Sequence, residues 1–292
     1  MNVNSDAWHT VAMAMRPFRR RRLGRVLAAE REQRSMSVEQ LAGSAEVAVS
    51  SINRIESGKM GAKIATLKAI MDVLDVPMDR REVIRSLARH ANTAAWWQPY
   101  TGDGVLPDWF QLYVDLEEEA SDLAIFDPQY INGLVQTEDY ARAMYRVGRP
   151  ADADTTIDRL VAVRMERQRR LVDGDMTLRL VMDESALSKQ FGGPALMRGQ
   201  LQRLLDLAEL RRVEMQILPA IEQPGIIGGF HLLDFSDPDD PAVVYIEHEA
   251  GAWYLEKPPQ IHAYARAYDR LRAAARSPQE SVVHVAQLMK EL

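Results

Sequence analysis

The chain lacks two features, cysteine and any long apolar run, and each absence excludes a class of protein. Without cysteine there are no disulfides, no thiolate metal sites and no cysteine nucleophile. No stretch approaches the roughly 20 consecutive apolar residues that are needed to cross a bilayer. The segment before Phe18 also lacks a continuous apolar stretch and a cleavage signal, so we expect a cytoplasmic protein.

The charge is unevenly distributed along the chain. Taken as an average, the net charge of −6 argues against a protein that binds nucleic acid. Residues 1–95, however, contain 16 Lys and Arg against 10 Asp and Glu, a net charge of +6. Residues 96–292 contain 20 against 32, a net charge of −12. Unless the asymmetry is accidental, this split predicts that only the first segment meets phosphate.

Apolar residues at helical spacing dominate the segment from Leu23 to residue 92. Leu23, Val26 and Leu27 recur at i, i+3 and i+4, which is typical of one face of a helix. Ser37 is placed to cap a second helix, and Pro77 is placed to end a fourth. The remaining predicted helices are about Val38–Gly43, Val49–Ser57, Ile64–Leu74 and Arg80–His90, the last with Val83, Ile84 and Leu87 inward. Together they predict a compact all-α domain over residues 23–92.

A proline- and glycine-containing segment, residues 93–107, predicts a linker to a second domain over residues 108–292. In that domain Val213, Met215 and Ile217 alternate with polar residues, as in a half-buried strand. The order of helices and strands predicts an α+β fold rather than regular βαβ winding. We expect strands at about Asp122–Phe126, Leu178–Met182, Val213–Leu218, Phe230–Phe235, Ala242–Glu247 and Ala252–Leu255. We expect helices at about Asp108–Glu119, Thr137–Val147, Asp154–Val172, Pro194–Leu210, Pro259–Arg276 and Pro278–Leu292.

Residues 37–59 have the pattern of a helix-turn-helix motif, in which two short helices joined by about four residues present the second helix to the major groove of DNA. Small Ala42 lets the two helices approach closely. The outward side of the second helix carries short or polar groups, which fit a groove about 12 Å wide. The apolar positions expected to lock the pair together are Leu41, Ala42, Val47, Ile52 and Ile55.

This segment resembles the XRE family of phage repressor-like helix-turn-helix proteins. The resemblance rests on Ser37, Leu41-Ala42, the run at residues 51–56, Gly58-Lys59 and the ending at residues 74–77. It covers about residues 23–77 and implies a homodimer that reads double-stranded DNA. Glu56 is expected to serve internal hydrogen bonding. The residues expected to contact DNA are Val49, Ser50, Ser51, Asn53 and Arg54 on the second helix, then Ser57 and Lys59 in the following loop.

Three positions depart from the pattern of that family. Glu46 stands where a glycine is usual in the turn, so we expect a strained left-handed backbone there. Ala48 stands where a Ser or Thr usually caps the second helix, and it has no side-chain oxygen to accept a hydrogen bond. Val38 replaces a glutamine that is frequent early in the first helix, so one polar contact near the DNA backbone is missing.

Four consecutive arginines precede the first predicted helix: Arg19, Arg20, Arg21 and Arg22. We interpret residues 1–22 as a flexible basic arm that enters a minor groove or follows phosphates. The alternative is a solvated start of the first helix that only aids solubility.

The C-terminal two-thirds of the chain has a second resemblance. It is similar to the antitoxin-like domain that follows an XRE domain in many actinobacterial regulators of the Scr toxin–antitoxin type. That resemblance implies that the domain binds a small protein encoded nearby or senses a small-molecule effector, and it implies no catalytic residue. The segments that carry it include Trp96-Trp97-Gln98, Leu106 to Phe110, Asp127-Pro128-Gln129, Gly133 to Arg142, Arg164 to Gln168, Asp183 to Leu187, Gly192-Gly193-Pro194, Gln200 to Leu210 and Asp237 to Glu247.

We find no pattern of catalytic or metal-binding residues in the second domain. His248 stands between two glutamates, and His231 lies on a neighbouring predicted strand, but a metal site needs three or four convergent ligands. We therefore expect no metal, no cofactor and no enzymatic activity. The acidic run Glu117 to Glu119 is interpreted as a solvated helix face. A group of aromatic residues is expected to dock the two domains or fill a core, with a ligand pocket as the alternative: Trp96, Trp97, Tyr100, Trp109, Phe110 and Tyr113.

The sequence therefore favours a sequence-specific DNA-binding transcriptional regulator whose C-terminal domain binds a small protein or a ligand. A second hypothesis is an antitoxin that neutralises a small partner and controls its own operon. A third is an enzyme with a DNA-binding appendage.

Overall fold

In the computed structural model, the described residues are 18–92, 95–101, 105–220, 228–237 and 240–292. The chain forms two compact units, Met1–Gln98 and Pro99–Leu292, and their boundary falls inside the predicted linker, 93–107. A short 3₁₀ turn, η1 (Gln98–Tyr100), lies at this boundary. Within the described part of the chain, no helix has the length and apolar character to cross a membrane.

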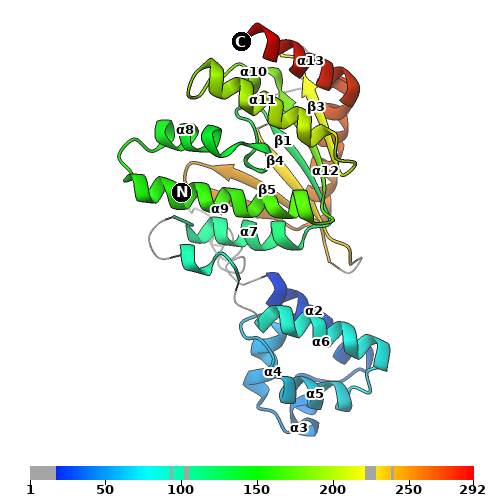
Figure 1. The fold of residues 1–292 in the computed structure, drawn as a ribbon. Helices are drawn as coiled ribbons and strands as arrows, with labels where there is room; N and C mark the ends of the chain where they lie inside the picture. Colours follow the sequence, from blue (N-terminus) through cyan, green and yellow to red (C-terminus); the bar gives the residue numbers. More distant parts are fainter. Residues whose placement is uncertain (1–17, 93–94, 102–104, 221–227, 238–239) are drawn as a thin grey trace, which may run out of the picture. The chain divides into compact units, whose positions relative to one another are not determined.

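The described part of the first unit contains five helices, and all five correspond to predicted ones (Figure 1). Their ends differ from the predicted ones by one or two residues, except that the first helix already includes Phe18, five residues before its predicted start at Leu23. Residues 1–17 of the predicted flexible arm lie outside the described residues. The helices are α2 (Phe18–Gln33), α3 (Val38–Ser44), α4 (Val49–Glu56), α5 (Ile64–Val73) and α6 (Met78–Asn92).

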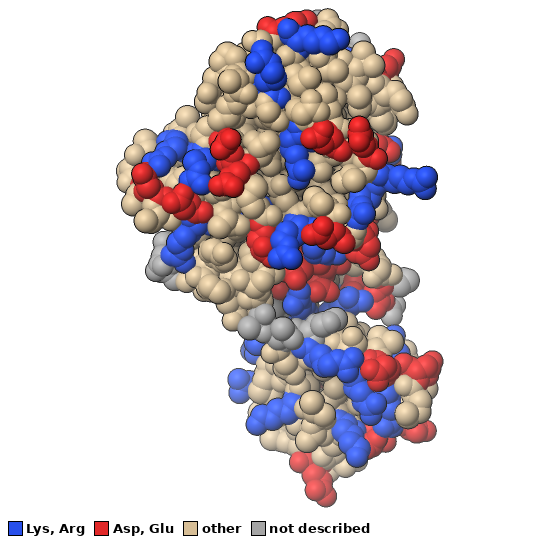
Figure 2. Space-filling model, in the orientation of Figure 1, with Lys and Arg blue, Asp and Glu red and all other residues tan. Residues whose placement is uncertain are grey.

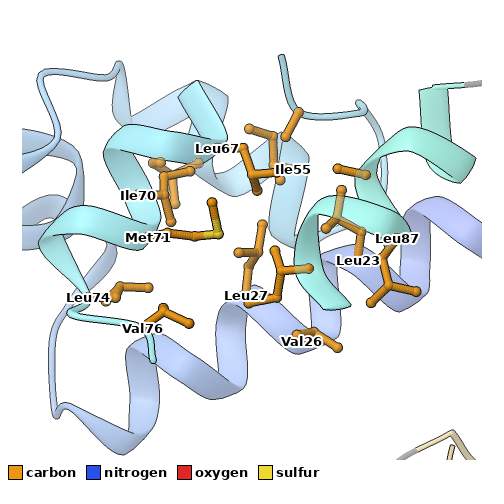
Figure 3. Close-up of a cluster of buried hydrophobic side chains, with 14 of the residues drawn as sticks. Leu23, Val26, Leu27, Ile55, Leu67, Ile70, Met71, Leu74, Val76 and Leu87 are labelled. Carbon is orange, nitrogen blue, oxygen red and sulfur yellow. The ribbon is translucent and has the colours of Figure 1, made fainter. Parts of the chain in front are cut away.

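One apolar core holds the first unit together. Side chains from α2, α4, α5 and α6 meet in it, with Leu23, Ile55 and Leu67 almost fully buried (Figure 3). Burying a side chain of this size contributes roughly 1.5–3 kcal/mol each. The prediction that Val83 faces inward is wrong, because the inward stripe of α6 follows Ile84, Leu87, Ala88 and Ala91, and Val83 falls beside it, 43% exposed.

The second unit is built on one six-stranded sheet with strand order β3-β2-β1-β4-β5-β6. Strands β1, β2 and β3 are parallel to one another, whereas β4, β5 and β6 run antiparallel to their neighbours. The α+β prediction is confirmed, although three strands form a parallel half that was not expected. The strands are β1 (Asp122–Asp127), β2 (Thr177–Asp183), β3 (Val213–Leu218), β4 (Phe230–Asp234), β5 (Val243–His248) and β6 (Gly251–Leu255).

Helices cover both faces of this sheet (Figure 1). On one face, Phe126, Phe230 and Leu232 pack against Tyr268 and Leu271 of α12. Side chains alternate between faces along a strand, so Ile125, His231 and Tyr245 point to the opposite face, under α7 and α9. The helices are α7 (Asp108–Glu119), α8 (Glu138–Gly148), α9 (Asp154–Asp173), α10 (Glu184–Leu187), α11 (Pro194–Ala208), α12 (Pro258–Ala274) and α13 (Pro278–Glu291), with a 3₁₀ turn η2 (Gly133–Val135).

Candidate nucleic-acid interface

Helix α3 begins at a capping box around Ser37. The backbone N–H of Gln40 donates to Oγ of Ser37 at 3.2 Å, and the backbone N–H of Ser37 donates to Oε1 of Gln40 at 2.8 Å. Two N–H groups that a helix start leaves unpaired are thereby satisfied. The prediction of Ser37 as the N-cap is confirmed, and its reciprocal partner Gln40 is an addition.

Helix α4 has one buried side and one exposed side. Ile52 and Ile55 are each 1% exposed and pack in the core. Val49, 39% exposed, lies on the solvent side with Ser50, Asn53 and Arg54, and Ser51 is partly buried. The outward face of α4 therefore consists of the short and polar groups that the sequence predicts for contact with base edges.

The loop after α4 turns sharply at Gly58. Its φ is 69°, and a Cβ atom added there would lie 2.9 Å from the Cα of Arg21. Both facts require glycine at this position. The turn is closed by a hydrogen bond from the backbone N–H of Met60 to the carbonyl of Arg54 at 3.0 Å. Lys59 is left exposed at the tip, and Ser57 is partly buried.

A second glycine, Gly24, sets how closely α2 approaches α4. A Cβ added to Gly24 would lie 2.3 Å from the carbonyl oxygen of Glu56 and 2.6 Å from that of Ile55. No side chain fits there without moving the backbone of α4. The sequence analysis did not single out Gly24. The signal was available, because a glycine inside a helical pattern costs about 1 kcal/mol and indicates a packing reason.

Glu56 and Arg31 join the same two helices by an ion pair. The Arg31 guanidinium donates from Nε to Oε1 of Glu56 at 2.8 Å and from Nη2 to Oε2 at 2.9 Å. Both side chains are 12% exposed, and the hydrogen bond to Glu56 raises the pKa of Arg31. The expectation that Glu56 serves internal hydrogen bonding is confirmed, and Arg31 is the partner that sequence reasoning missed.

The four consecutive arginines lie inside helix α2, not in an arm ahead of it. Phe18, in the first described turn of this helix, is 2% exposed and anchors it in the unit. The Arg20 guanidinium donates from Nε to the carbonyl of Ala91 at 3.3 Å, and the Arg21 guanidinium lies 5.7 Å from the Phe18 ring. The prediction that residues 19–22 belong to a flexible arm is therefore corrected. Arg20 contributes to holding α2 against the end of α6.

The two departures in the turn are present as expected. Glu46 has φ 56°, a left-handed conformation that costs an L-residue other than glycine roughly 1–2 kcal/mol. Ala48 stands at the N-cap of α4 and makes no side-chain cap hydrogen bond. The turn that joins α3 and α4 therefore contains one strained residue and lacks one side-chain cap, and each of these lowers the stability of the unit.

Charged side chains of both signs lie on the visible faces of the two units (Figure 2). On the first unit Lys and Arg are spread across the face and Asp and Glu lie mainly towards its right and lower edges, whereas on the second unit the two kinds are interspersed. This agrees with the net charges of +6 and −12 in the two parts of the sequence. A positive field around the first unit favours approach to a polyanion.

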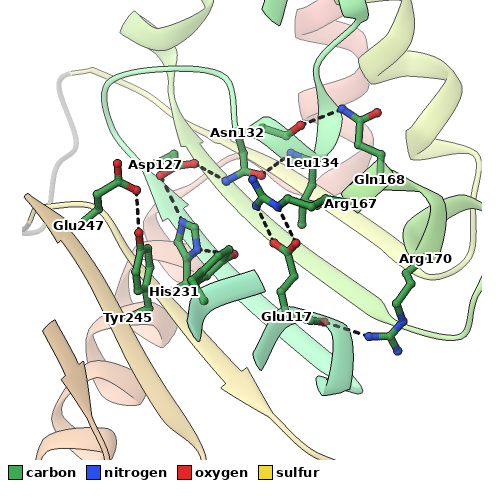
Figure 4. Close-up of polar contacts among 12 residues, drawn as sticks. Glu117, Asp127, Asn132, Leu134, Arg167, Gln168, Arg170, His231, Tyr245 and Glu247 are labelled. Atoms are coloured by element: carbon green, nitrogen blue, oxygen red, sulfur yellow. Dashed lines mark hydrogen bonds and ion pairs between the residues drawn. The ribbon is translucent and has the colours of Figure 1, made fainter. Parts of the chain in front are cut away.

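The second unit contains a buried ion pair, Glu117 with Arg167 (Figure 4). Arg167 donates from Nε and Nη2 to the two carboxylate oxygens, each at 2.7 Å, and the side chains are 8% and 5% exposed. Burial by itself would lower the pKa of Arg167, but the charge and hydrogen bonds of Glu117 outweigh it and raise that pKa. The interpretation of residues 117–119 as a solvated face is therefore wrong for Glu117.

His231 belongs to the same region, through Tyr113. Its Nδ1 lies 2.8 Å from the Tyr113 hydroxyl, and its Nε2 lies 3.7 Å from Oδ1 of Asp127. His248 instead lies beside the Trp253 ring, with centroids 4.9 Å apart. Over the described ranges, no three His, Asp or Glu side chains are arranged to hold a metal ion.

The predicted aromatic group is divided between the units. Trp96 and Trp97 belong to the first unit, whereas Trp109, Phe110 and Tyr113 lie on α7 in the second. Phe110 and Tyr113 are stacked with centroids 5.3 Å apart, and the Arg167 guanidinium lies 5.0 Å from the Phe110 ring. Within the second unit these rings form part of the packing around the buried ion pair.

Two known domain families match this chain. Residues 22–90 match a helix-turn-helix domain, and residues 110–287 match a domain of unknown function, DUF5753. No curated protein and no solved structure gave a significant match. The first match agrees with the helices α2 to α6, and supports a DNA-binding regulator. The second spans most of the sheet-containing unit.

Proposed function

The chain belongs to the DUF5753 family, and its first unit matches a helix-turn-helix domain. From these two matches we propose that it is a sequence-specific, cytoplasmic transcriptional regulator of the XRE type, not an enzyme. The single observation that carries the proposal is the outward face of α4. Val49, Ser50, Asn53 and Arg54 are exposed side by side on a helix whose other side is fixed in the core. A helix with such a face can enter the major groove and read base edges.

The fixation of α4 supports reading rather than nonspecific attraction. Gly24 and the Arg31–Glu56 pair hold the helix against α2, so the backbone that carries the exposed side chains keeps one position in the unit. Direct readout depends on such placement, because each hydrogen bond to a base edge requires a defined geometry. Lys59, at the tip of the following loop, is suited to phosphate, which positions the protein without reading sequence.

Replacing Arg54 and Lys59 separately tests this division of roles. Arg54→Ala should cost about 1–3 kcal/mol at the cognate site and relax the preference at one base pair. Lys59→Ala should weaken binding to all sequences about equally. Binding is measured by fluorescence anisotropy on the cognate site and on single-base variants of it. Unchanged specificity in Arg54→Ala would mean that the wrong side of α4 was assigned.

We also propose that the regulator acts as a homodimer. A single helix-turn-helix unit buries little surface on DNA, and proteins of this type read two half-sites about one helical turn apart. The core of residues 18–92 engages the inward faces of its helices, so the second unit is the expected source of the dimer interface. Light scattering at micromolar concentration should give twice the chain mass of 33.0 kDa, and a monomer with and without operator would contradict this.

The second unit is proposed to control DNA binding through a small protein partner or a ligand. The resemblance to antitoxin-like domains favours a partner encoded nearby, and the net charge of −12 suits a basic protein. A binder that prefers one arrangement of the DNA-binding units shifts operator affinity by its differential affinity for the two arrangements, usually about 1–3 kcal/mol.

Titrating a purified candidate partner into the regulator–operator complex tests this control. A change in operator affinity of about 5- to 150-fold is the usual scale of such coupling. If the partner binds residues 96–292 and operator affinity stays constant, regulation through this unit is wrong. The alternative, an antitoxin that mainly neutralises its partner, predicts that co-expression of the chain relieves the toxicity of that partner.

A further inference from the structure

Arg164 and Arg167 lie one turn apart on α9, and only one of them has a carboxylate partner. Arg167 is paired with Glu117 through two hydrogen bonds. Arg164 donates from Nη1 to the neutral Oε1 of Gln136 at 2.5 Å, and its guanidinium lies 4.2 Å from the Tyr145 ring. Within the described part of the chain, no carboxylate lies at ion-pair distance from Arg164.

One nitrogen of Arg164 lies in the interior without a partner among the described residues. Its Nε is shielded from solvent and has no acceptor among the described residues, and the backbone at Gly133 covers it, since a Cβ added there would lie 3.3 Å from Nε. Burial lowers the pKa of Arg164, and the charge of Arg167 adds to this effect. A cation in such a place is costly unless an anion compensates it. The residue as a whole remains partly exposed.

Three buried glutamine side chains hold the segment from Ile131 to Gln136, which lies beside Arg164. Gln136 donates to the carbonyl of Ile131 at 2.6 Å, and Gln200 donates to that of Val135 at 2.8 Å. Gln168 donates to the carbonyls of Gly133 at 2.8 Å and of Gln136 at 2.9 Å. The acceptor that orients Arg164 is therefore itself held on several sides, which is how binding groups are preorganised.

The charges nearby select the kind of anion. Glu247 attracts Arg164 electrostatically from an exposed position at the end of β5, where its Oε2 accepts from the Tyr245 hydroxyl at 2.8 Å. Because Arg167 is neutralised by Glu117, the positive charge left over is that of one arginine, and Glu247 attracts it. The single charge of a carboxylate matches a single guanidinium, with which it forms two parallel hydrogen bonds, better than the double charge of a phosphate dianion does.

We propose that Arg164 binds the carboxylate of a small organic ligand, with Gln136 and Tyr145 as positioning residues. This inference deepens the proposed function by naming the chemical class of the effector. It rests on the proposed function only where it expects the ligand to change the affinity for DNA. Binding to Arg164 itself is independent of DNA and is measured without it.

The test is thermal unfolding of the full chain with sodium benzoate or sodium acetate as the probe. Sodium chloride and sodium phosphate at equal ionic strength are the comparisons. A carboxylate should raise the melting temperature in a saturable way, and Arg164→Met should abolish the rise. Arg169→Met, which removes an arginine that is 67% exposed on the same helix, should keep it. Arg164→Lys, which keeps the charge without the planar fork, should need about tenfold more ligand.

The unliganded protein gives a second readout. Arg164→Met removes a cation that has no carboxylate partner, but it also removes the donor to the buried Oε1 of Gln136, so its melting temperature should fall by much less than that of Arg167→Met. A fall like that of Arg167→Met, or failure to fold, would show that Arg164 is structural and would overturn the proposal. So would the absence of a saturable shift with either carboxylate, or a shift with phosphate alone. If the carboxylate binds and operator affinity stays constant, the site is supported and only its link to DNA binding fails.

Discussion

The two units handle charge in opposite ways. In the first, the partly buried ion pairs Glu30–Arg80 and Glu56–Arg31 join helices, and the exposed side of α4 is left short and polar. In the second unit an ion pair lies in the interior, because Arg167 and Glu117 are buried between α9 and α7. Arg164, beside them, is the exception that lacks a carboxylate within the described residues.

This difference explains why function is easier to recognise in the first unit. A groove-reading helix works through side chains on its surface, and their spacing follows directly from the sequence. In the second unit the informative polar groups come from α7, η2, α9 and β5, which are far apart in the sequence. These polar groups come together only when the chain folds.

The largest effect is expected from removing the buried partner of Glu117. Arg167→Met leaves a carboxylate buried without a cation, which typically costs about 3–5 kcal/mol. Urea denaturation of the full chain should show the loss in the second unit, while operator binding at low urea persists through the separate core of α2 to α6. The double variant Glu117→Leu with Arg167→Met should recover most of the loss. If Arg167→Met were as stable as the unsubstituted protein, the second unit would not depend on its buried ion pair, and the contrast with the first unit would be wrong.

A smaller effect is expected at the contact between α2 and α4. Gly24→Ala places a Cβ 2.3 Å from the carbonyl oxygen of Glu56, so the recognition helix must shift, at a cost of about 1–3 kcal/mol. Gly43→Ala is the matched control, because a Cβ there meets nothing within 4 Å and the change should be neutral or stabilising. Both are measured by thermal unfolding and operator binding. Equal behaviour of the two variants would show that the close approach has no role.

The smallest effect concerns the cap of the recognition helix. Ala48→Ser should supply the missing side-chain acceptor at the start of α4 and stabilise the free protein by ~1 kcal/mol. Ser37→Ala should change stability by a similar amount in the opposite direction, because Ser37 already caps α3. Denaturant midpoints of the two variants give the comparison. A loss of stability in Ala48→Ser would mean that the turn cannot accommodate the cap.

Much of the fold could be predicted because its signals are local. Helix α7 and strand β3 occur at the residues expected from periodicity, since apolar spacing and proline punctuation act within a few residues. The pairing of β1 with β2 in parallel was missed, because strand order depends on contacts about 50 residues apart. Val83 was misplaced for a different reason: two adjacent apolar residues on α6 compete for one inward position, and Ile84 takes it.

The candidate sites divide in the same way. The outward side of α4, the strained Glu46 and the uncapped Ala48 follow from position within the motif. Arg31, Gly24 and Arg167 could not be assigned their roles, since each depends on a partner on another helix. Glu117 illustrates the limit, because it stands beside two more exposed glutamates and only the fold distinguishes it.

The central claim is that the first unit reads a DNA sequence, and equilibrium binding of the full chain to fragments of its own genome tests it most directly. We expect a few fragments to bind at least about 10³-fold more tightly than scrambled DNA of equal length. Their affinity should fall steeply as salt rises from about 50 to 200 mM, because Lys and Arg contacts release counterions from phosphate. Equal binding to every fragment, binding that ignores salt, or no binding at all would contradict the account.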